Sequence, residues 1–277
     1  MKPRIILLLL ITSIGGAFLA ASGPPPIITM TVILLGGTLT AGGANAINHY
    51  MDRDIDKIML RTQGRPIPSN RIRPLSAMTY GILLNGAGFL VLAVGANILS
   101  ASLAVGASVF YILIYTKWLK RSTPQNIVIG GAAGAIPPLV AWAAITGSIS
   151  LPAVYLFLII LLWTPPHFWA LSLLLKDDYA RANVPMLPVV KGERHTSKAI
   201  LIYTLVLVAS TILLYTSGGL GFIYLTTAVI LGILFILEAT RLFFKITHYR
   251  TRRLFQFSLL YLALLFVAII VDTSLTL

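Results

Sequence analysis

The sequence predicts an all-α protein that crosses a membrane many times. Hydrophobic residues make up 57% of the 277 residues and charged residues only 10%, and the mean hydropathy is +0.91. This composition is too apolar for a soluble domain of such a length. The apolar residues also form separate runs, each close to the ~20 residues that a helix needs to cross a bilayer. We therefore expect a polytopic helical bundle that forms one integral-membrane domain over residues 1–277.

Nine apolar segments follow one another, and we expect each to form a transmembrane helix. Their approximate bounds are 5–21, 27–49, 75–94, 96–115, 126–145, 152–174, 199–216, 220–240 and 254–272. The first segment has no evident small-residue cleavage site, so we interpret it as a retained helix rather than a signal peptide. Glycines in the second and fifth segments predict close packing between helices.

The basic residues predict the orientation of the chain. Lys and Arg occur before the first segment, at Lys2 and Arg4, and in four longer connections, at 50–74, 115–125, 175–198 and 241–253. Nine spans place all of them on one face, which the positive-inside rule identifies as cytoplasmic, together with the N-terminus. Membrane topology therefore accounts for the net charge of +13, and we expect a lipid bilayer but no nucleic acid as a partner.

The stretch from Asn48 to Pro68 carries the clearest chemical signal. Asn48, Asp52 and Asp56 are four residues apart, so a continuing helix would place them on one face. Amide and carboxylate oxygens are ligands that Mg²⁺ accepts. Asp54 lies about 160° from Asp56 around a helix, so we expect it to pair with a neighbouring base. The alternative is that all three acids are surface carboxylates.

A second acidic pair, Asp177 and Asp178, follows the sixth segment and is a partial counterpart of the first. Two acidic patches that face each other could hold one or two metal ions over one diphosphate. Basic and polar residues near them could neutralise a departing diphosphate. These residues are Arg53, Arg61, Arg65, Tyr115, Lys117, Lys120, Arg121 and Asn126. The alternative is that these cations only set the topology.

His167 lies within an apolar segment, between Trp163 and Trp169. Such an aromatic neighbourhood suits a large planar ligand, whereas the alternative is a histidine that hydrogen-bonds within the bundle. His49, next to the acidic stretch, could contact the same ligand or hold the acidic site in place. The chain has no cysteine, which excludes disulfides and thiolate metal sites. It also lacks nucleotide-binding and HExxH motifs, so ATPase and metalloprotease functions have no support.

Several motifs in order along residues 2 to about 192 resemble the UbiA-type intramembrane prenyltransferases, and within them the protohaem IX farnesyltransferases. They include Lys2-Pro3-Arg4, Asn48-x3-Asp52-x3-Asp56, Arg61-Thr62, Tyr115-Thr116-Lys117, Gly134-Ala135-Ile136-Pro137-Pro138, His167-Phe168-Trp169 and Pro185-Met186-Leu187-Pro188. The last third of the chain resembles the family mainly in hydropathy. The second acidic motif departs from the DxxxD of many relatives, because Ala182 stands four positions after Asp178.

The resemblance implies a nine-helix bundle in the cell membrane, with a central cavity open to the cytoplasm and to lipid. It implies transfer of a farnesyl group from farnesyl diphosphate to the 2-vinyl group of haem b, a substrate rather than a cofactor. The products are haem O and diphosphate, and haem A synthase is a candidate partner. Another aromatic or tetrapyrrole acceptor is one alternative, and a membrane transporter is another.

The resemblance also assigns roles to the residues singled out above. Magnesium would bind Asn48, Asp52, Asp56, Asp177 and Asp178. Asp52, Asp56, Arg65 and Lys117 would be catalytic, and the basic residues, with Tyr115 and Asn126, would bind the diphosphate. His167, His49 and Trp169 would be candidate contacts of the haem.

Overall fold

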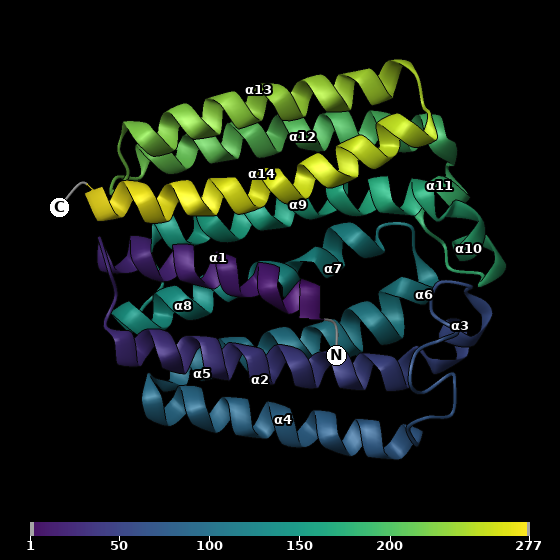
Figure 1. The fold of residues 1–277 in the computed structure, drawn as a ribbon, viewed down its shortest axis with the longest axis horizontal. Helices are drawn as coiled ribbons and strands as arrows, with labels where there is room; N and C mark the ends of the chain where they lie inside the picture. The colour runs from purple at the N-terminus through teal and green to yellow at the C-terminus, as the bar shows by residue number, and fades with distance from the viewer. Residues whose placement is uncertain (1–2, 276–277) are drawn as a thin grey trace.

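The computed structural model describes residues 3–275, and the side chains from Ile6 onward. Lys2 and the side chain of Arg4 lie outside the described residues. Within that range the chain is helical and contains no strand. Its long helices run side by side along the longest axis of the molecule, and the chain ends at the side of the molecule opposite α3 and α10 (Figure 1).

Each of the nine predicted apolar segments corresponds to a helical segment in the described range. They are α1 (Pro3–Ala21), α2 (Ile27–Met51), α4 (Pro74–Gly95), α5 with η1 and α6 (Ile98–Val109, Phe110–Leu119, Lys120–Ser122), α7 with α8 (Asn126–Ala135, Pro137–Thr146), α9 (Leu151–Leu174), α12 (Gly192–Thr216), α13 (Phe222–Phe244) and α14 (His248–Leu275). Eight of them are long and apolar enough to span a membrane, and α1 contributes the shorter apolar stretch Ile6–Ala21. The fold is therefore that of a multi-pass membrane protein.

The connections observed between the helices are shorter than those that the sequence predicted. The predicted loop 115–125 is helical as far as Ser122, and α13 and α14 leave only residues 245–247 of the predicted loop 241–253 outside a helix. The loop 175–198 contains α10 (Lys176–Arg181), α11 (Leu187–Val190) and the start of α12. A helix can continue beyond its apolar residues, because its backbone groups remain hydrogen-bonded to one another whether lipid or water surrounds them.

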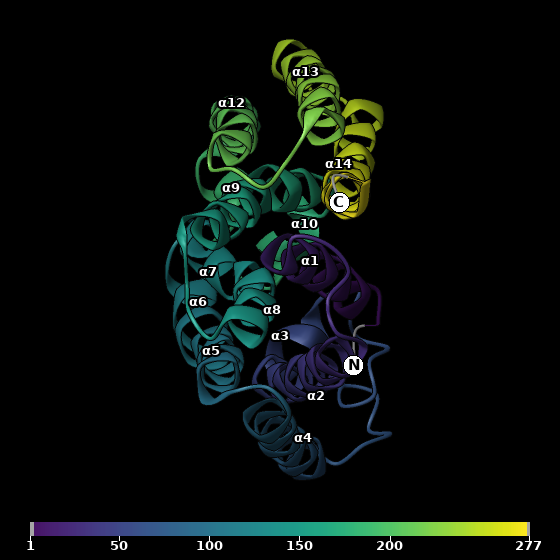
Figure 2. The ribbon, with the colours of Figure 1, turned by 90° about the vertical axis from the view of Figure 1, so that its left-hand side faces the viewer.

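Glycines allow α2 and α4 to pack closely. A Cβ atom at Gly43 would lie 2.6 Å from the carbonyl oxygen of Gly81, and one at Gly88 would lie 2.9 Å from that of Gly36. Side chains larger than hydrogen at these positions would force the two backbones apart. This contact keeps α2, which leads into the first acidic residues, against α4 at the edge of the bundle (Figure 2).

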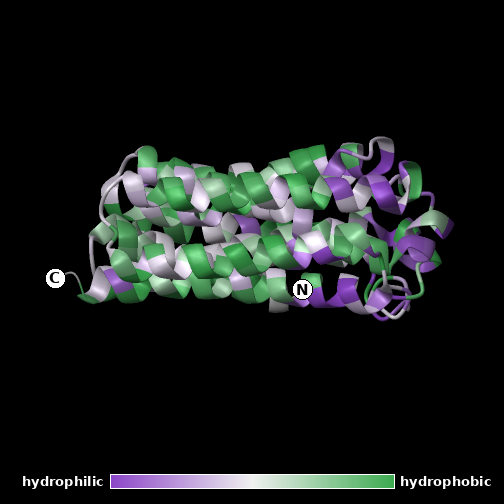
Figure 3. Cartoon of the chain, turned by 90° about the horizontal axis from the view of Figure 1, so that it is seen from above, coloured by the Kyte–Doolittle hydropathy of each residue, from purple (hydrophilic) through white to green (hydrophobic). Residues whose placement is uncertain are grey.

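Polar residues gather at one end of the molecule. Figure 3 shows hydrophilic residues concentrated at the end opposite the C-terminus, where α3 (Arg53–Ile58), α10 and α11 lie. At this end Glu238 of α13 is buried and pairs with Arg241 at 2.5 Å and Arg253 at 3.0 Å. We call this the charged end. It coincides with the side on which the sequence places all the long basic connections.

Candidate active site

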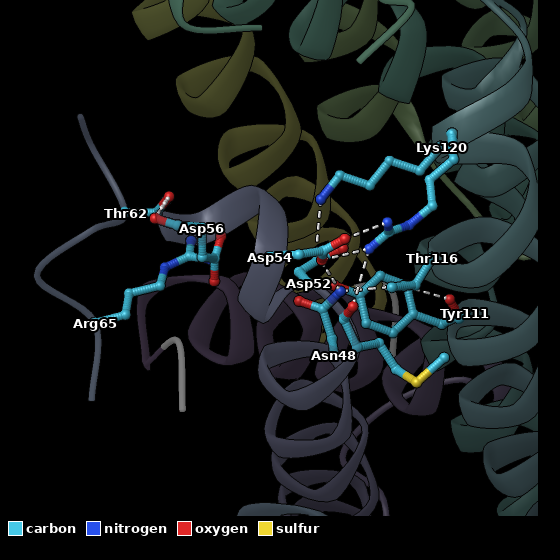
Figure 4. A network of polar contacts seen from close by, with 11 residues as sticks. Asn48, Asp52, Asp54, Asp56, Thr62, Arg65, Tyr111, Thr116 and Lys120 are labelled. Atoms are coloured by element: carbon cyan, nitrogen blue, oxygen red, sulfur yellow. Dashed lines mark hydrogen bonds and ion pairs between the residues drawn. The ribbon is translucent and has the colours of Figure 1, made fainter. Parts of the chain in front are cut away.

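The first acidic residues lie where α2 meets α3. The backbone N–H of Asp52 donates to the Asn48 carbonyl at 2.9 Å, and that of Asp56 donates to the Asp52 carbonyl at 2.8 Å. Asn48, Asp52 and Asp56 are each no more than 2% exposed. The side chains of Asn48 and Asp52 meet, as their spacing predicted, but Asp56 turns toward Arg65 instead (Figure 4).

Asp52 is held by an amide and a cation. The side-chain N–H of Asn48 donates to Oδ2 of Asp52 at 2.8 Å and to the Thr116 hydroxyl of η1 at 3.1 Å. The Lys120 ammonium lies 2.6 Å from the same carboxylate oxygen. The other oxygen, Oδ1, is buried and has no hydrogen-bond partner among the described residues. A buried carboxylate oxygen without a partner is costly, so this position favours a cation or a donor from a ligand.

Asp56 has a cation of its own. The Arg65 guanidinium donates to Oδ1 at 2.9 Å and to Oδ2 at 2.8 Å. The Thr62 hydroxyl donates to the Asp56 carbonyl at 3.1 Å, which folds the segment after α3 back onto the helix. Arg65 and Lys120 thus neutralise the two buried carboxylates from different segments of the chain (Figure 4).

Asp54 lies on the outer side of α3. Its side chain is 59% exposed and pairs with Arg121 at 2.6 Å. The hydrogen bond from Arg121 lowers the pKa of Asp54 to about 2. Next to this pair is a surface cavity of about 470 Å³ whose lining also includes Tyr50, Arg53 and Lys117. Arg53, Lys117 and Arg121 therefore lie together, on a side of α3 different from that of Arg65.

The second acidic pair reaches the segment after α3. Asp178 is buried and accepts the backbone N–H groups of Leu60 at 3.2 Å and Arg61 at 3.3 Å, and it also pairs with Arg181. Although burial opposes ionisation, these hydrogen bonds hold the pKa of Asp178 below its ordinary value. Asp177 is exposed. The two acidic stretches thus meet, as their partial repetition suggested, but through backbone groups.

A π-helix places two tyrosine rings beside Asp52. In η1 the backbone hydrogen bonds join residues five apart, so residues four and five apart lie on one face of the helix. The rings of Tyr111 and Tyr115 stack with centroids 5.6 Å apart and planes 12° apart. Tyr115 also covers Gly130 of α7, where a Cβ atom would lie 2.2 Å from the ring. Thr116, which binds Asn48, comes from the same turn.

Asn126 lies at the start of α7 and is fully buried. Its side-chain N–H donates to the Thr123 carbonyl at 2.7 Å, and its Oδ1 has no hydrogen-bond partner among the described residues. Arg61 lies near Tyr179, and burial raises the pKa of this tyrosine although Arg61 opposes the rise. Both residues thus supply polar atoms at the charged end.

The candidate haem contacts point in different directions. His167 stacks between Trp163, at 4.3 Å, and Phe255, at 4.8 Å. Trp169 is 2% exposed and packs edge-on against Tyr203 of α12 at 5.3 Å. His49 is buried near the end of α2. Of the two candidates on α9, His167 therefore faces α14 and Trp169 belongs to the core around α12.

The donor set suits a divalent cation that is shared with a substrate. Among the described residues, no three His, Asp or Glu side chains lie close enough together to hold a metal. Mg²⁺ commonly takes one or two carboxylates and completes its shell with water and phosphate oxygens. The unpartnered Oδ1 of Asp52 fits such an ion, and the surrounding lysine and arginines fit its anionic companion.

Sequence reasoning gave no role in this site to several of its residues. Thr116 and Tyr111 belong to it through the geometry of the π-helix, and Tyr179 through its contact with Arg61. The spacing of Tyr111 and Tyr115 was the only local signal. Ser258 of α14, which contacts His167 at 2.7 Å, lies outside all the recognised motifs.

The fold and this buried acidic site define an intramembrane prenyltransferase, and the chain belongs to the UbiA prenyltransferase family, whose model matches residues 9–269. Solved structures support the fold. A digeranylgeranylglyceryl phosphate synthase gives a TM-score of 0.77 at 22% identity, covering 99% of both chains. A UbiA homologue from Archaeoglobus fulgidus bound to DMAPP and Mg²⁺ gives 0.67 at 16% identity, covering 97% of both.

Within that family the chain belongs with the protoheme IX farnesyltransferases. It is 54% identical to the protoheme IX farnesyltransferase of Gloeobacter violaceus over 240 residues, covering 86% of this chain and 78% of that protein. It is 50% identical to that of Symbiobacterium thermophilum, covering 85% and 80%. The chain is therefore an enzyme, and the transporter alternative is set aside.

Proposed function

We propose that this enzyme transfers a farnesyl group from farnesyl diphosphate to the 2-vinyl group of protohaem IX, giving haem O and diphosphate. The observation that carries the proposal is the Asp52 carboxylate, which is buried beside Lys120 and Asn48 with one oxygen unpartnered. Together with membership of the protoheme IX farnesyltransferases, this oxygen supports a site for the cation that accompanies a prenyl diphosphate.

We assign metal binding to Asn48, Asp52 and Asp56, and Asp56 would join the ion by releasing Arg65, which contacts both of its oxygens. A bound Mg²⁺ would neutralise charge on the diphosphate as it leaves. Asp178, a predicted ligand, is engaged with two backbone N–H groups and Arg181, so we assign it the role of holding the segment that carries Arg61 and Arg65. Asp177 is exposed beside it and would contribute charge rather than a ligand atom.

The basic residues divide between two tasks. Lys120 and Arg65 contact the buried carboxylates and would meet the diphosphate where its negative charge grows as the allylic C–O bond breaks. Arg61 would add a third positive charge beside Lys120 and Arg65. The buried Oδ1 of Asn126 would accept a hydrogen bond from bound water. Arg53, Lys117 and Arg121 line the surface cavity, where they would attract the anionic substrate from the aqueous side.

The stacked rings of Tyr111 and Tyr115 would face the farnesyl cation and stabilise it by attraction to their π faces. The terminal vinyl carbon of haem then bonds to C1 of the farnesyl group. The inner vinyl carbon becomes cationic, adds water as a hydroxyl, and releases one proton to the departing diphosphate. Exclusion of other water by the helices limits premature capture of the farnesyl cation.

The setting of the reaction follows from the topology. We propose that the charged end faces the cytoplasm of the cell membrane, with the N-terminus on the same side, because every long basic connection lies there. The haem O product carries a farnesyl tail and stays in lipid. An enzyme that oxidises haem O further, such as haem A synthase, would then be a partner in the same membrane.

A matched pair of aspartates tests the proposal. In cells that express the protein, extraction of haems and mass measurement should detect haem O. Asp52→Asn should lower haem O formation by about 100-fold or more, because a carboxylate that holds the cation is lost. Asp54→Asn, on the exposed side of the same helix, should stay within a few-fold of wild type. Haem O at wild-type levels from Asp52→Asn would refute the assignment, and a different prenylated product would identify another acceptor.

A further inference from the structure

The hydrogen bonds around His167 favour a proton on one of its two ring nitrogens. The Ser258 hydroxyl donates its single hydrogen to the Phe255 carbonyl at 2.7 Å. The same hydroxyl oxygen lies 2.7 Å from Nδ1 of His167. A proton on Nδ1 lets Ser258 accept from the ring while it donates to the carbonyl, and Nε2 then keeps its lone pair. This nitrogen has no hydrogen-bond partner in the part of the chain that the structure describes.

The ring is also held in one orientation. Trp163 stacks on one face of the imidazole, with planes 14° apart, and Phe255 on the other, with planes 23° apart. The Trp163 indole N–H donates to the Ser258 carbonyl at 2.7 Å. This hydrogen bond joins α9 to α14 next to His167. The lone pair of Nε2 lies in the plane of the ring, so the two stacking partners leave it uncovered.

The positions of neighbouring residues along α9 show in which direction the His167 side chain projects. Trp163 reaches α14, and Thr164 lies against Gly131 of α7. At about 100° per residue, His167 projects between those two directions, on the opposite side of α9 from Trp169. Figure 2 shows α7 and α14 on either side of α9, and α1 and α8 on the side of α9 away from α12. His167 therefore projects toward the side of α9 on which α1 and α8 lie.

The depth of His167 suits a porphyrin whose edge reaches the acidic site. It lies seven residues before the end of α9 at Leu174, which is about 10 Å below the charged end. On α7, Gly130 lies against Tyr115 and Gly131 lies against Thr164. Gly134, one turn further along, lies on the face of α7 between these two contacts. A Cβ atom at Gly134 would meet nothing within 4 Å. This position of α7 therefore leaves open space.

We propose that Nε2 of His167 is an axial ligand of the haem iron in the substrate, and that Ser258 is the residue that positions it. This inference rests on the proposed function, because it takes haem as the acceptor. Histidines that bind metals commonly donate their second N–H to a neighbouring oxygen, which fixes the tautomer and strengthens the ligand. The bond uses the lone pair of Nε2, and no proton or electron is transferred. Ligation of the iron holds the porphyrin in one register while its vinyl group meets the farnesyl cation.

Binding of two probes by the purified full-length protein tests the ligand. Ferric protohaem IX has an iron that histidine can bind, whereas metal-free protoporphyrin IX has the same shape without it. The wild-type protein should bind the haem at least tenfold more tightly than the porphyrin. His167→Ala should abolish this preference and shift the Soret band of the bound haem, and added imidazole should restore the wild-type spectrum. His195→Ala and His248→Ala, both exposed at the charged end, should retain the preference.

Variants of Ser258 test the positioning role separately. Ser258→Ala should weaken haem binding by about tenfold and leave porphyrin binding unchanged, whereas Ser258→Thr, which keeps the hydroxyl, should bind like wild type. A haem spectrum and preference that are unchanged in His167→Ala would overturn the proposal. Asp52→Asn separates the two hypotheses, because it should lose haem O formation while keeping the preference for iron. If the wild type keeps that preference but forms no haem O, the proposed reaction is wrong and the iron ligand stands.

Discussion

At the scale of single residues, the site is built from buried carboxylates that each have a dedicated cation. Asp52 has Lys120 from the end of η1, and Asp56 has Arg65 from the segment after α3. A buried ion pair contributes little net stability, but the removal of one partner leaves an uncompensated charge. The pairs therefore place a positive charge against each of the two buried acids.

The Asp56–Arg65 pair makes a prediction about stability. Arg65→Met should destabilise the protein by about 3 kcal/mol, because Asp56 would stay buried without a partner. The double variant Asp56→Asn with Arg65→Met should recover much of this loss, since it removes the buried charge. Thermal unfolding in detergent measures both. Equal losses in the single and double variants would show that Arg65 acts by packing rather than by charge.

Asp54 predicts a dependence of stability on pH. Its pKa in the folded protein, about 2, lies below the ordinary value of 3.8 because of Arg121. Its contribution to stability is therefore fully present above about pH 4 and is lost as the pH falls toward 2. In Arg121→Gln the unfolding temperature should fall less steeply between pH 4 and 2 than in wild type. Arg252→Gln, an exposed residue of the same charge, is the control, and parallel curves for all three proteins would contradict the prediction.

At the scale of elements, the π-helix η1 is the feature that assembles the site. It brings the hydroxyl of Thr116 to Asn48 and stacks Tyr111 on Tyr115. Gly130 of α7 leaves the space into which the Tyr115 ring fits. The close approach of α7 and η1 thus depends on a residue without a side chain.

Gly130→Ala should therefore disturb the aromatic pair. The new methyl group would start 2.2 Å from the Tyr115 ring, so the ring must move away from the farnesyl cation. The loss of about 1–2 kcal/mol of cation–π stabilisation should lower haem O formation about 5–30-fold and release more farnesol. Gly106→Ala, where a Cβ atom meets nothing within 4 Å, should behave like wild type. An unchanged ratio of haem O to farnesol in Gly130→Ala would rule out this role for the rings.

Elements and contacts differ in how well the sequence predicts them. The apolar segments predicted the helices, because bilayer thickness fixes their length and composition. The helix ends were less accurate, since the charged residues near them are compatible with either helix or loop. Asp178 pairs with backbone groups 117 and 118 residues away, and backbone N–H groups leave no signature in a sequence. His167 and Ser258 are 91 residues apart, and a lone serine in an apolar helix carries no signal.

At the scale of the whole molecule, the two ends differ in charge. The long basic connections lie at the end with α3 and α10 (Figure 1), whereas the connections at the other end, near 22–26, 147–150 and 217–221, carry no Lys or Arg. At that other end Asp272 is buried and accepts the N–H groups of Ile223 and Tyr224 at the start of α13. Its charge therefore caps a helix and does not form a second anionic surface.

Single-cysteine labelling can test this orientation, because the chain has no cysteine of its own. Gln63 lies at the charged end and Ser148 in the connection between α8 and α9 at the other end, and both are exposed. In intact cells a membrane-impermeant maleimide should label Ser148→Cys, and it should label Gln63→Cys only after lysis. The reverse pattern would contradict a cytoplasmic site. The expected pattern would place Asp52, Lys120 and Arg65 on the side where a water-soluble diphosphate head group can reach them, while the porphyrin and the farnesyl chain enter from lipid.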